Sequence, residues 1–188
     1  MSSEHLRLFF AVDVPEDRLV ALATRAEPLR QRSEGARWIP VENQHVTLKF
    51  LGSTPEGHVS ALLETMRAVS ARHAPFELRL AELGTFPERG KARVLWAGFD
   101  DPSPLRDLAA DLDAALVPQG HQPDNRPFSA HLTLARFRIP APVRGLVDVD
   151  LEGLDPFTVS EVGLWRSRLS PQGARYERLG GAALGARA

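Results

Sequence analysis

The spacing of apolar and polar residues along the chain predicts alternating strands and helices of ordinary length. Within residues 45–51, every second side chain is apolar, which is typical of a strand with one buried face. Similar alternation or short apolar runs predict further strands over 7–13, 76–80, 92–99, 129–135 and 157–165. Apolar residues at helical spacing predict helices within 15–29, 59–69 and 102–118.

Three segments carry no such period. Residues 38–40 indicate a loop, the Pro- and Gly-containing stretch 118–127 indicates another, and the Gly/Ala-rich residues 180–188 indicate a frayed tail. Nothing in the composition marks an independent linker, so we expect one domain over 1–188.

A four-residue pattern, His-x-Thr-Leu, occurs twice. It is found at 45–48 and at 131–134, an offset of 86 residues. The same offset aligns the apolar strand segment 8–11 with 94–97, and it brings the helices that follow these strands to matching places. We therefore expect two copies of a strand, helix, loop and strand unit, around 6–51 and 92–137.

Within each motif, the histidine and the threonine share one face of the strand, because side chains at i and i+2 point the same way. If an approximate two-fold axis relates the copies, His45 and Thr47 face the same cleft as His131 and Thr133. Two imidazoles across one phosphorus atom suit phosphodiester chemistry: a neutral ring accepts the proton of the attacking oxygen, and a protonated ring gives a proton to the leaving oxygen. The threonine hydroxyls donate to the non-bridging oxygens. This scheme needs neither metal nor cofactor.

Simpler interpretations exist for the same residues. One His-x-Thr alone would usually be an ordinary half-exposed strand face, but its repetition argues against that. His45 and His131 could instead ligate zinc, although no closely spaced third ligand is evident. No Gly-rich nucleotide loop is present. The remaining histidines have no matching partner and are expected at the surface: His5, His58, His73 and His121.

Composition narrows the class of protein. The 188 residues include 23 Lys and Arg, 24 Asp and Glu, and no Cys, which excludes disulfides, thiolate nucleophiles and cysteine-ligated metals. No apolar run is long enough to span a bilayer and the start resembles no signal peptide, so we expect a cytoplasmic protein. A net charge of −1 disfavours extended contact with nucleic acid but not recognition of one phosphate.

Taken in order, these motifs resemble the 2H phosphoesterases, specifically the bacterial RNA 2′,3′-cyclic phosphodiesterase branch, also called 2′–5′ RNA ligase. The resemblance covers nearly the whole chain. It rests on the stretches Arg7-Leu-Phe-Phe-Ala-Val, Arg37-Trp38, Glu42-Asn-Gln-His-Val-Thr-Leu-Lys-Phe-Leu-Gly52, Phe128-Ser-Ala-His-Leu-Thr-Leu-Ala-Arg136, Ser167-Arg-Leu and Tyr176.

The resemblance implies a bilobal α+β fold, with two pseudo-symmetric lobes that each have an antiparallel sheet and outer helices, and a central active-site cleft. It also implies metal-independent hydrolysis of a terminal RNA 2′,3′-cyclic phosphate to a 2′-phosphomonoester. His45 corresponds to the proton donor and His131 to the acceptor. Thr47 and Thr133 correspond to phosphate-binding hydroxyls.

Arg136 matches a basic position that the family uses near the phosphate, and Phe50 stands at the equivalent place in the first copy. The alternative for Arg136 is an exposed charge at a strand end. Phe9 and Trp38 could stack on the terminal base or belong to the core. The chain departs from the family after the tyrosine, at 180–183, which leaves the last strand in doubt.

Other functions remain compatible with these residues. The same two imidazoles could catalyse 2′–5′ ligation, in which a 5′-hydroxyl replaces water. The protein could also bind RNA ends without turnover, or act on a small cyclic nucleotide. We expect a monomer whose partner is an RNA with a 2′,3′-cyclic phosphate end, with no membrane, metal or cofactor involved.

Overall fold

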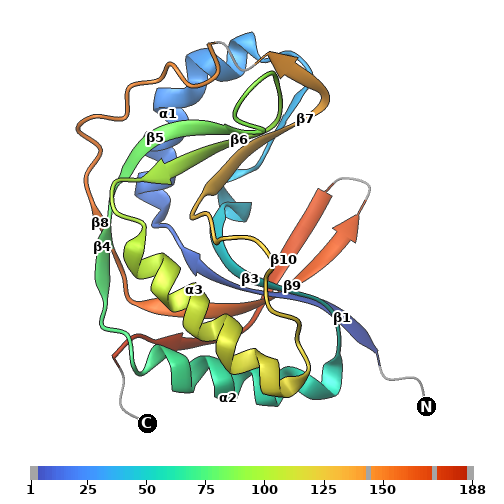
Figure 1. Cartoon of the computed structure of the whole chain (residues 1–188). Coiled ribbons are helices and arrows are strands. Elements are labelled where there is room, and N and C mark those ends of the chain that lie inside the picture. The colour runs from blue at the N-terminus through green and yellow to red at the C-terminus, as the bar shows by residue number, and fades with distance from the viewer. Residues whose placement is uncertain (1–3, 143–144, 171–172, 186–188) are drawn as a thin grey trace.

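A computed structural model describes residues 4–142, 145–170 and 173–185. This part of the chain is a mixed α/β structure with antiparallel strands (Figure 1). The helices are α1 (Glu16–Arg32), α2 (Val59–Ser70) and α3 (Ser103–Leu116), with short 3₁₀ turns at Val41–Asn43, Glu56–His58 and Val117–Gln119. The strands are β1 (His5–Asp13), β2 (Ala36–Trp38), β3 (His45–Pro55), β4 (Phe76–Leu78), β5 (Leu80–Phe86), β6 (Lys91–Phe99), β7 (Leu132–Pro142), β8 (Phe157–Val159), β9 (Glu161–Ser170) and β10 (Gly173–Ala183).

Two half-sheets are joined edge to edge at a narrow seam. The strand order is β10-β9-β1-β3-β7-β6-β5, with β2 added beside β7, while β4 and β8 form a separate two-stranded ribbon. We call β10, β9, β1 and β3 the first lobe, and β7, β6, β5 and β2 the second lobe. Between β3 and β7 the register contains a single pair, Val46 with Leu132. The α+β bilobal fold expected from the sequence is confirmed.

The residues of that seam are themselves equivalent in the repeat, because Val46 and Leu132 are 86 positions apart. Antiparallel pairing of equivalent residues places a pseudo-two-fold axis through this pair. Because the two strands are antiparallel, the histidine of each motif lies across from the threonine of the other motif, on the same face of the sheet. The local fold thus gathers four polar side chains around one axis.

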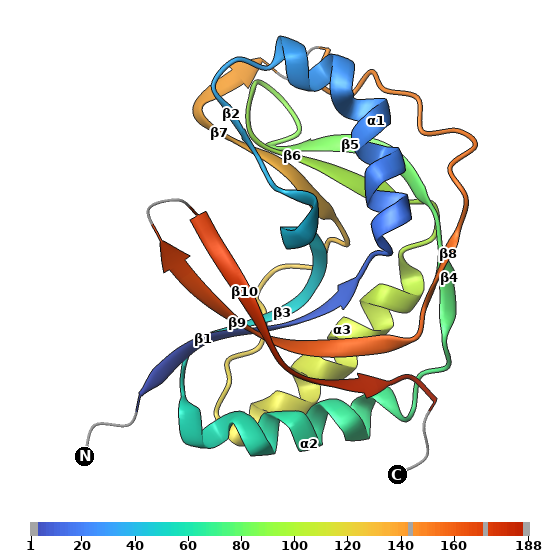
Figure 2. The same cartoon turned by 180° about the vertical axis from the view of Figure 1, so that it is seen from behind.

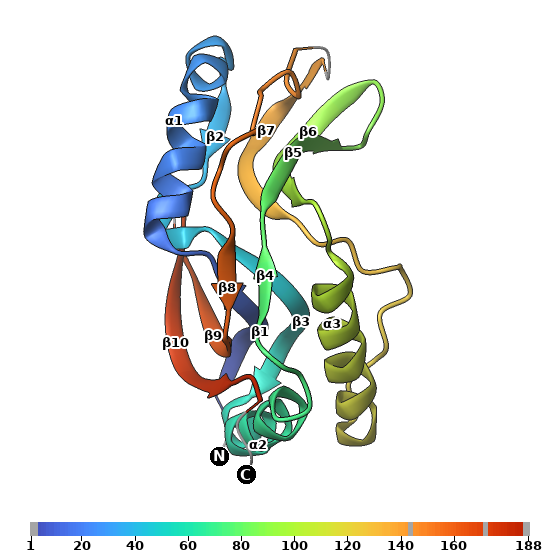
Figure 3. The same cartoon turned by 90° about the vertical axis from the view of Figure 1, so that its left-hand side faces the viewer.

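The helices of the two repeat units are exchanged between the lobes. α1 and β2 follow β1 in the chain, yet β2 pairs with β7 and α1 lies beside the second lobe (Figures 2 and 3). α3 follows β6, yet it packs against β3 and α2 in the first lobe. The units around 6–51 and 92–137 therefore do not coincide with the lobes, because each sends its helix across the seam.

Several sequence-based assignments change. Trp38, expected in a loop, ends strand β2. Of residues 180–188, expected to form a frayed tail, 180–183 pair with β9 and Leu184 is buried, while 186–188 lie outside the described residues. Gly180 and Gly181 have no side chains, so this stretch shows no alternation of apolar and polar residues from which a strand could be predicted. His73, expected at the surface, is partly buried against Asp111 at 3.0 Å.

In β3, burial follows the predicted alternation only through Leu48, because Lys49 is buried and Phe50 is exposed. In β1 both faces are covered, since Leu8, Phe9 and Phe10 are all 1% exposed or less. Among the buried residues that the structure describes, Lys49 is the one charged side chain, and it is 3% exposed in β3. No helix in the described ranges is both long and apolar enough to cross a membrane.

Candidate active site

A cavity of about 620 Å³ opens where the two lobes meet. Its wall contains five of the six residues that the sequence singled out: His45, Thr47, His131, Thr133 and Arg136. The remaining wall comes from the segment between β2 and β3, from β3 and β10, and from the irregular segment before β7: Ile39, Asn43, Leu48, Lys49, Phe50, Asp124, Asn125, Arg126, Pro127, Phe128, Ser129 and Tyr176. The two motifs therefore share one space, although 86 residues separate them.

The ring of His45 is fixed by two aromatic side chains and one hydrogen bond. It stacks on Phe9, with ring centroids 4.8 Å apart and planes 24° apart, and it meets Tyr176 edge-on at 4.9 Å. A hydrogen bond with the backbone of Asn43 fixes the ring further. Phe9 is 1% exposed and is not in the cavity wall, so the structure favours its alternative as a core residue that supports His45.

The ring of His131 is likewise held by one backbone hydrogen bond and two aromatic side chains. Its Nδ1 lies 2.8 Å from the carbonyl oxygen of Ser129, a bond in which the ring nitrogen must donate. Phe86 meets the ring edge-on at 5.1 Å and Trp96 lies at 6.4 Å. A neutral His131 thus carries its proton on Nδ1 and leaves Nε2 free to accept another. Asn43 and Ser129 are also 86 positions apart, so the repeat extends to the groups that orient the rings.

Both imidazoles favour the neutral form in the free protein. Burial lowers the pKa of His45 to about 4; the bond to Asn43 opposes that shift and the charge of His131 adds to it. Burial also lowers the pKa of His131, with the Ser129 bond opposing and the charge of Arg136 reinforcing the change. Near neutral pH, a proton acceptor is therefore ready, whereas a proton donor must gain its proton as an anion binds.

Thr47 and Thr133 each stand two residues after a histidine and line the cavity beside it. Arg136 is exposed, lines the same cavity and lies close enough to His131 to lower the pKa of that ring. A guanidinium and two hydroxyls facing one space can bind the oxygens of a phosphate group. Trp38 is partly buried, packs against the core and does not line this cavity.

Sequence reasoning gave no role to three residues of the site. Tyr176 was part of the family resemblance but received no function, because nothing in its local sequence shows that β10 folds back to His45. Lys49 looked like a solvent-facing strand residue. Phe50 was assigned to the apolar face of the 45–51 strand and noted as the counterpart of Arg136, yet it is 61% exposed in the cavity wall, which is unusual for so large an apolar side chain.

Among residues 4–142, 145–170 and 173–185, no group of three His, Cys, Asp or Glu side chains is placed to hold a metal ion.

Comparison with known proteins places the chain in a family. A model of the "2′-5′ RNA ligase superfamily" matches residues 15–170. The chain belongs to the 2′-5′ RNA ligase superfamily. The family assigned from the His-x-Thr repeat is confirmed.

Three curated relatives of this chain carry the name RNA 2′,3′-cyclic phosphodiesterase. The protein of Methanothermobacter thermautotrophicus is 31% identical over 91% of this chain and 95% of its own length. That of Thermus thermophilus is 35% identical over 91% and 86%. That of Geobacillus stearothermophilus is 38% identical over 76% of this chain, and the match spans only 46% of the relative.

Solved structures agree with the fold. The protein TT0787 of Thermus thermophilus superposes with a TM-score of 0.81 at 34% identity, covering 96% of this chain and 98% of that chain. LigT of E. coli in its apo form gives a TM-score of 0.78 at 29% identity, covering 97% and 99%. LigT has also been solved in complex with 3′-AMP, at 28% identity and a TM-score of 0.78 over 96% of this chain and 99% of that one.

Proposed function

We propose that this protein hydrolyses the terminal 2′,3′-cyclic phosphate of RNA to a 2′-phosphomonoester, with its two histidines as acid and base and without a metal ion. The supporting observation is that both His-x-Thr motifs open into one cavity at the seam between the lobes. The shared name of the curated relatives supports the same substrate and reaction class.

In this mechanism, water attacks the phosphorus in line with O3′. Nε2 of His131 accepts the proton of the water as the new P–O bond forms. The P–O3′ bond breaks, and protonated His45 gives its proton to O3′, while the P–O2′ bond remains. Thr47, Thr133 and Arg136 hold the non-bridging oxygens, where negative charge grows in the transition state.

The buried donor receives its proton through the substrate. In the free protein, burial keeps the pKa of His45 at about 4. A bound phosphodiester is an anion next to the ring, and an adjacent negative charge favours the protonated form of histidine. Substrate binding therefore raises the pKa of His45 and converts it into an acid. Burial and the charge of Arg136 lower the pKa of His131, which keeps that ring neutral and able to accept the proton of the water.

In-line attack also gives the substrate a direction. Water enters on the side of His131, so O3′ and the ribose that carries it lie on the side of His45. Phe50 is on that side: it belongs to the same strand, and its ring contacts Phe9, the stacking partner of His45, at 5.8 Å. We assign to Phe50 the role of a stacking surface for the terminal base, in place of Phe9.

Phe50→Ala should raise KM for a cyclic-phosphate RNA end by roughly 5- to 150-fold, because base stacking on an aromatic side chain contributes about 1–3 kcal/mol. Steady-state kinetics with an oligoribonucleotide measure this. Phe50→Trp should restore KM, and Ile139→Ala, which trims another exposed apolar side chain outside the cavity, should leave it unchanged. An unchanged KM in Phe50→Ala would show that the terminal base does not stack on Phe50.

The proposed activity is tested with an oligoribonucleotide that ends in a 2′,3′-cyclic phosphate, incubated in excess chelator. We expect a 2′-phosphate end as the product. Addition of a second RNA with a 5′-hydroxyl measures ligation against hydrolysis in the same tube. Tight binding without any product over hours would show that the protein binds RNA ends without turnover. Activity that is lost when chelator is added would exclude the metal-free mechanism.

A further inference from the structure

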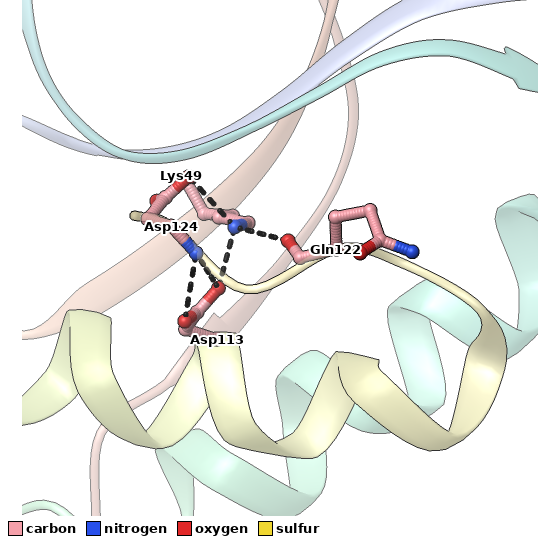
Figure 4. A network of polar contacts seen from close by, with 4 residues as sticks. All are labelled: Lys49, Asp113, Gln122 and Asp124. Carbon is pink, nitrogen blue, oxygen red and sulfur yellow. Dashed lines mark hydrogen bonds and ion pairs between the residues drawn. The ribbon is translucent and has the colours of Figure 1, made fainter. Parts of the chain in front are cut away.

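Lys49 carries a buried charge that the mechanism above does not use. It lies in β3, four residues after His45, and its side chain is only 3% exposed. Its Nζ donates to the Asp113 carboxylate at 2.5 Å, to the Asp124 carboxylate at 2.9 Å and to the carbonyl oxygen of Gln122 at 3.0 Å (Figure 4). The three N–H groups of the ammonium are thereby all used.

This network is closed rather than a simple ion pair. The backbone N–H of Asp124 donates to the Asp113 carboxylate at 3.2 Å, so the two acidic residues are also joined to each other. Burial would lower the pKa of Lys49, but the hydrogen bonds and charges of Asp113 and Asp124 outweigh it and raise the pKa. The lysine stays charged, and it ties β3 to α3 and to the segment that follows α3.

That segment leads directly into the second motif. Residues 121–131 form neither helix nor strand, so their place depends on side-chain contacts. Immediately after Asp124, residues 125–129 form one wall of the cavity, and the carbonyl of Ser129 holds Nδ1 of His131. A side chain of the first motif strand thus fixes the backbone that orients the histidine of the second.

The repeat contains only one such contact. The position equivalent to Lys49, 86 residues later, is Ala135, which is fully buried and apolar. The first motif therefore anchors the second, and no matching lysine anchors the first. His45 instead receives its support from Phe9 and Tyr176, which come from strands β1 and β10.

We propose that Lys49 is a positioning residue: through Gln122, Asp113 and Asp124 it sets the 121–131 segment so that Ser129 holds His131 in the Nδ1–H form opposite His45. The proposal deepens the function proposed above and rests on it for the reaction concerned. The tautomer of His131 can be observed without any turnover, so the two proposals can fail separately.

Lys49→Met tests this proposal, because it keeps the apolar stem and removes the charge. We expect kcat to fall by up to about 100-fold, since a displacement near 1 Å of a catalytic group can cost that much. Nitrogen-15 NMR of the histidine rings should show His131 losing its single Nδ1–H tautomer while His45 keeps its signals. Lys49→Arg should recover part of both properties.

Two control variants separate positioning from general stability. Lys91→Met removes the only other lysine, which is exposed at the start of β6, and should leave kcat and the His131 signals unchanged. Leu22→Ala, on the buried face of α1, should lower the melting temperature without altering the tautomer. A folded Lys49→Met protein with parental kcat and His131 signals would overturn the proposal.

If Lys49→Met does not fold, Asp124→Asn replaces it. The Asp124 side chain is 60% exposed, so the fold tolerates this change, and only one of the three lysine contacts is weakened. We expect a smaller fall in kcat and a smaller shift of the His131 signals in the same direction. Signals and kcat equal to the parent values would again contradict the positioning role.

Discussion

His45→Ala and His131→Ala will each lower kcat on a cyclic-phosphate RNA end by about 10²- to 10⁴-fold, the range that general acid or base catalysis contributes. Both rings line the same cavity and each is oriented by the backbone two residues before it, so neither can substitute for the other. Single-turnover kinetics with enzyme in excess measure the effect on the chemical step.

The double variant and the pH profile refine this expectation. Groups that act as one unit are not additive, so His45→Ala combined with His131→Ala should lose little more than either change alone. Removal of the donor should flatten the alkaline limb of the kcat profile, and removal of the acceptor the acidic limb. His5→Ala, an exposed histidine outside the cavity, is the matched control. Near-parental kcat in either single variant would refute the two-histidine mechanism.

Acidification will destabilise the protein well above the pH at which carboxylates titrate. The pKa of His45 is about 4 in the folded protein and 6.5 in an unfolded chain, so between these values the unfolded state binds the extra proton. Stability is therefore full above pH 6.5 and falls as the pH drops toward 4. From pH 7.5 to pH 5, His45 alone accounts for about 2 kcal/mol of lost unfolding free energy.

Urea denaturation at pH 5 and pH 7.5 measures this loss. His45→Gln cannot take up the proton, so it should lose about 2 kcal/mol less than the parent over the same interval. The pKa of His131 is lowered in the same direction, so His131→Gln should also flatten the dependence. His5→Gln is the control for removal of an exposed imidazole. Equal slopes for the parent and His45→Gln would mean that His45 is not held neutral by burial.

The sequence was most informative where the chemistry repeats. Two copies of His-x-Thr-Leu at a constant offset predicted that two distant strands meet, and the pairing of Val46 with Leu132 has them meet at equivalent residues. The exchange of α1 and α3 between the lobes was not predictable, because an apolar helix face does not specify which sheet covers it. The end of β10 was not predicted either, because its glycines and alanines show no alternation of apolar and polar side chains.

Some residues of the candidate site could likewise be predicted from the sequence and others could not. His45, Thr47, His131 and Thr133 were singled out because strand periodicity fixes where each motif points. Phe9 was chosen for its aromatic ring, but periodicity cannot tell a ring in the cavity wall from one a layer beneath it, as the stack on His45 shows. Contacts made by distant residues, such as those of Lys49 and Tyr176, depend on tertiary structure that no local pattern encodes.

The seam between β3 and β7 has a consequence for how acid and base can differ. Contact between equivalent residues across a two-fold axis is what two separate, identical half-chains would make. In such a symmetric pair every substitution appears twice, so both imidazoles would have the same neighbours and the same proton affinity. A continuous chain is free of that constraint. Phe50 and Arg136 stand at equivalent places, one apolar and one cationic, so one half of the molecule can hold the nucleoside and the other the charge.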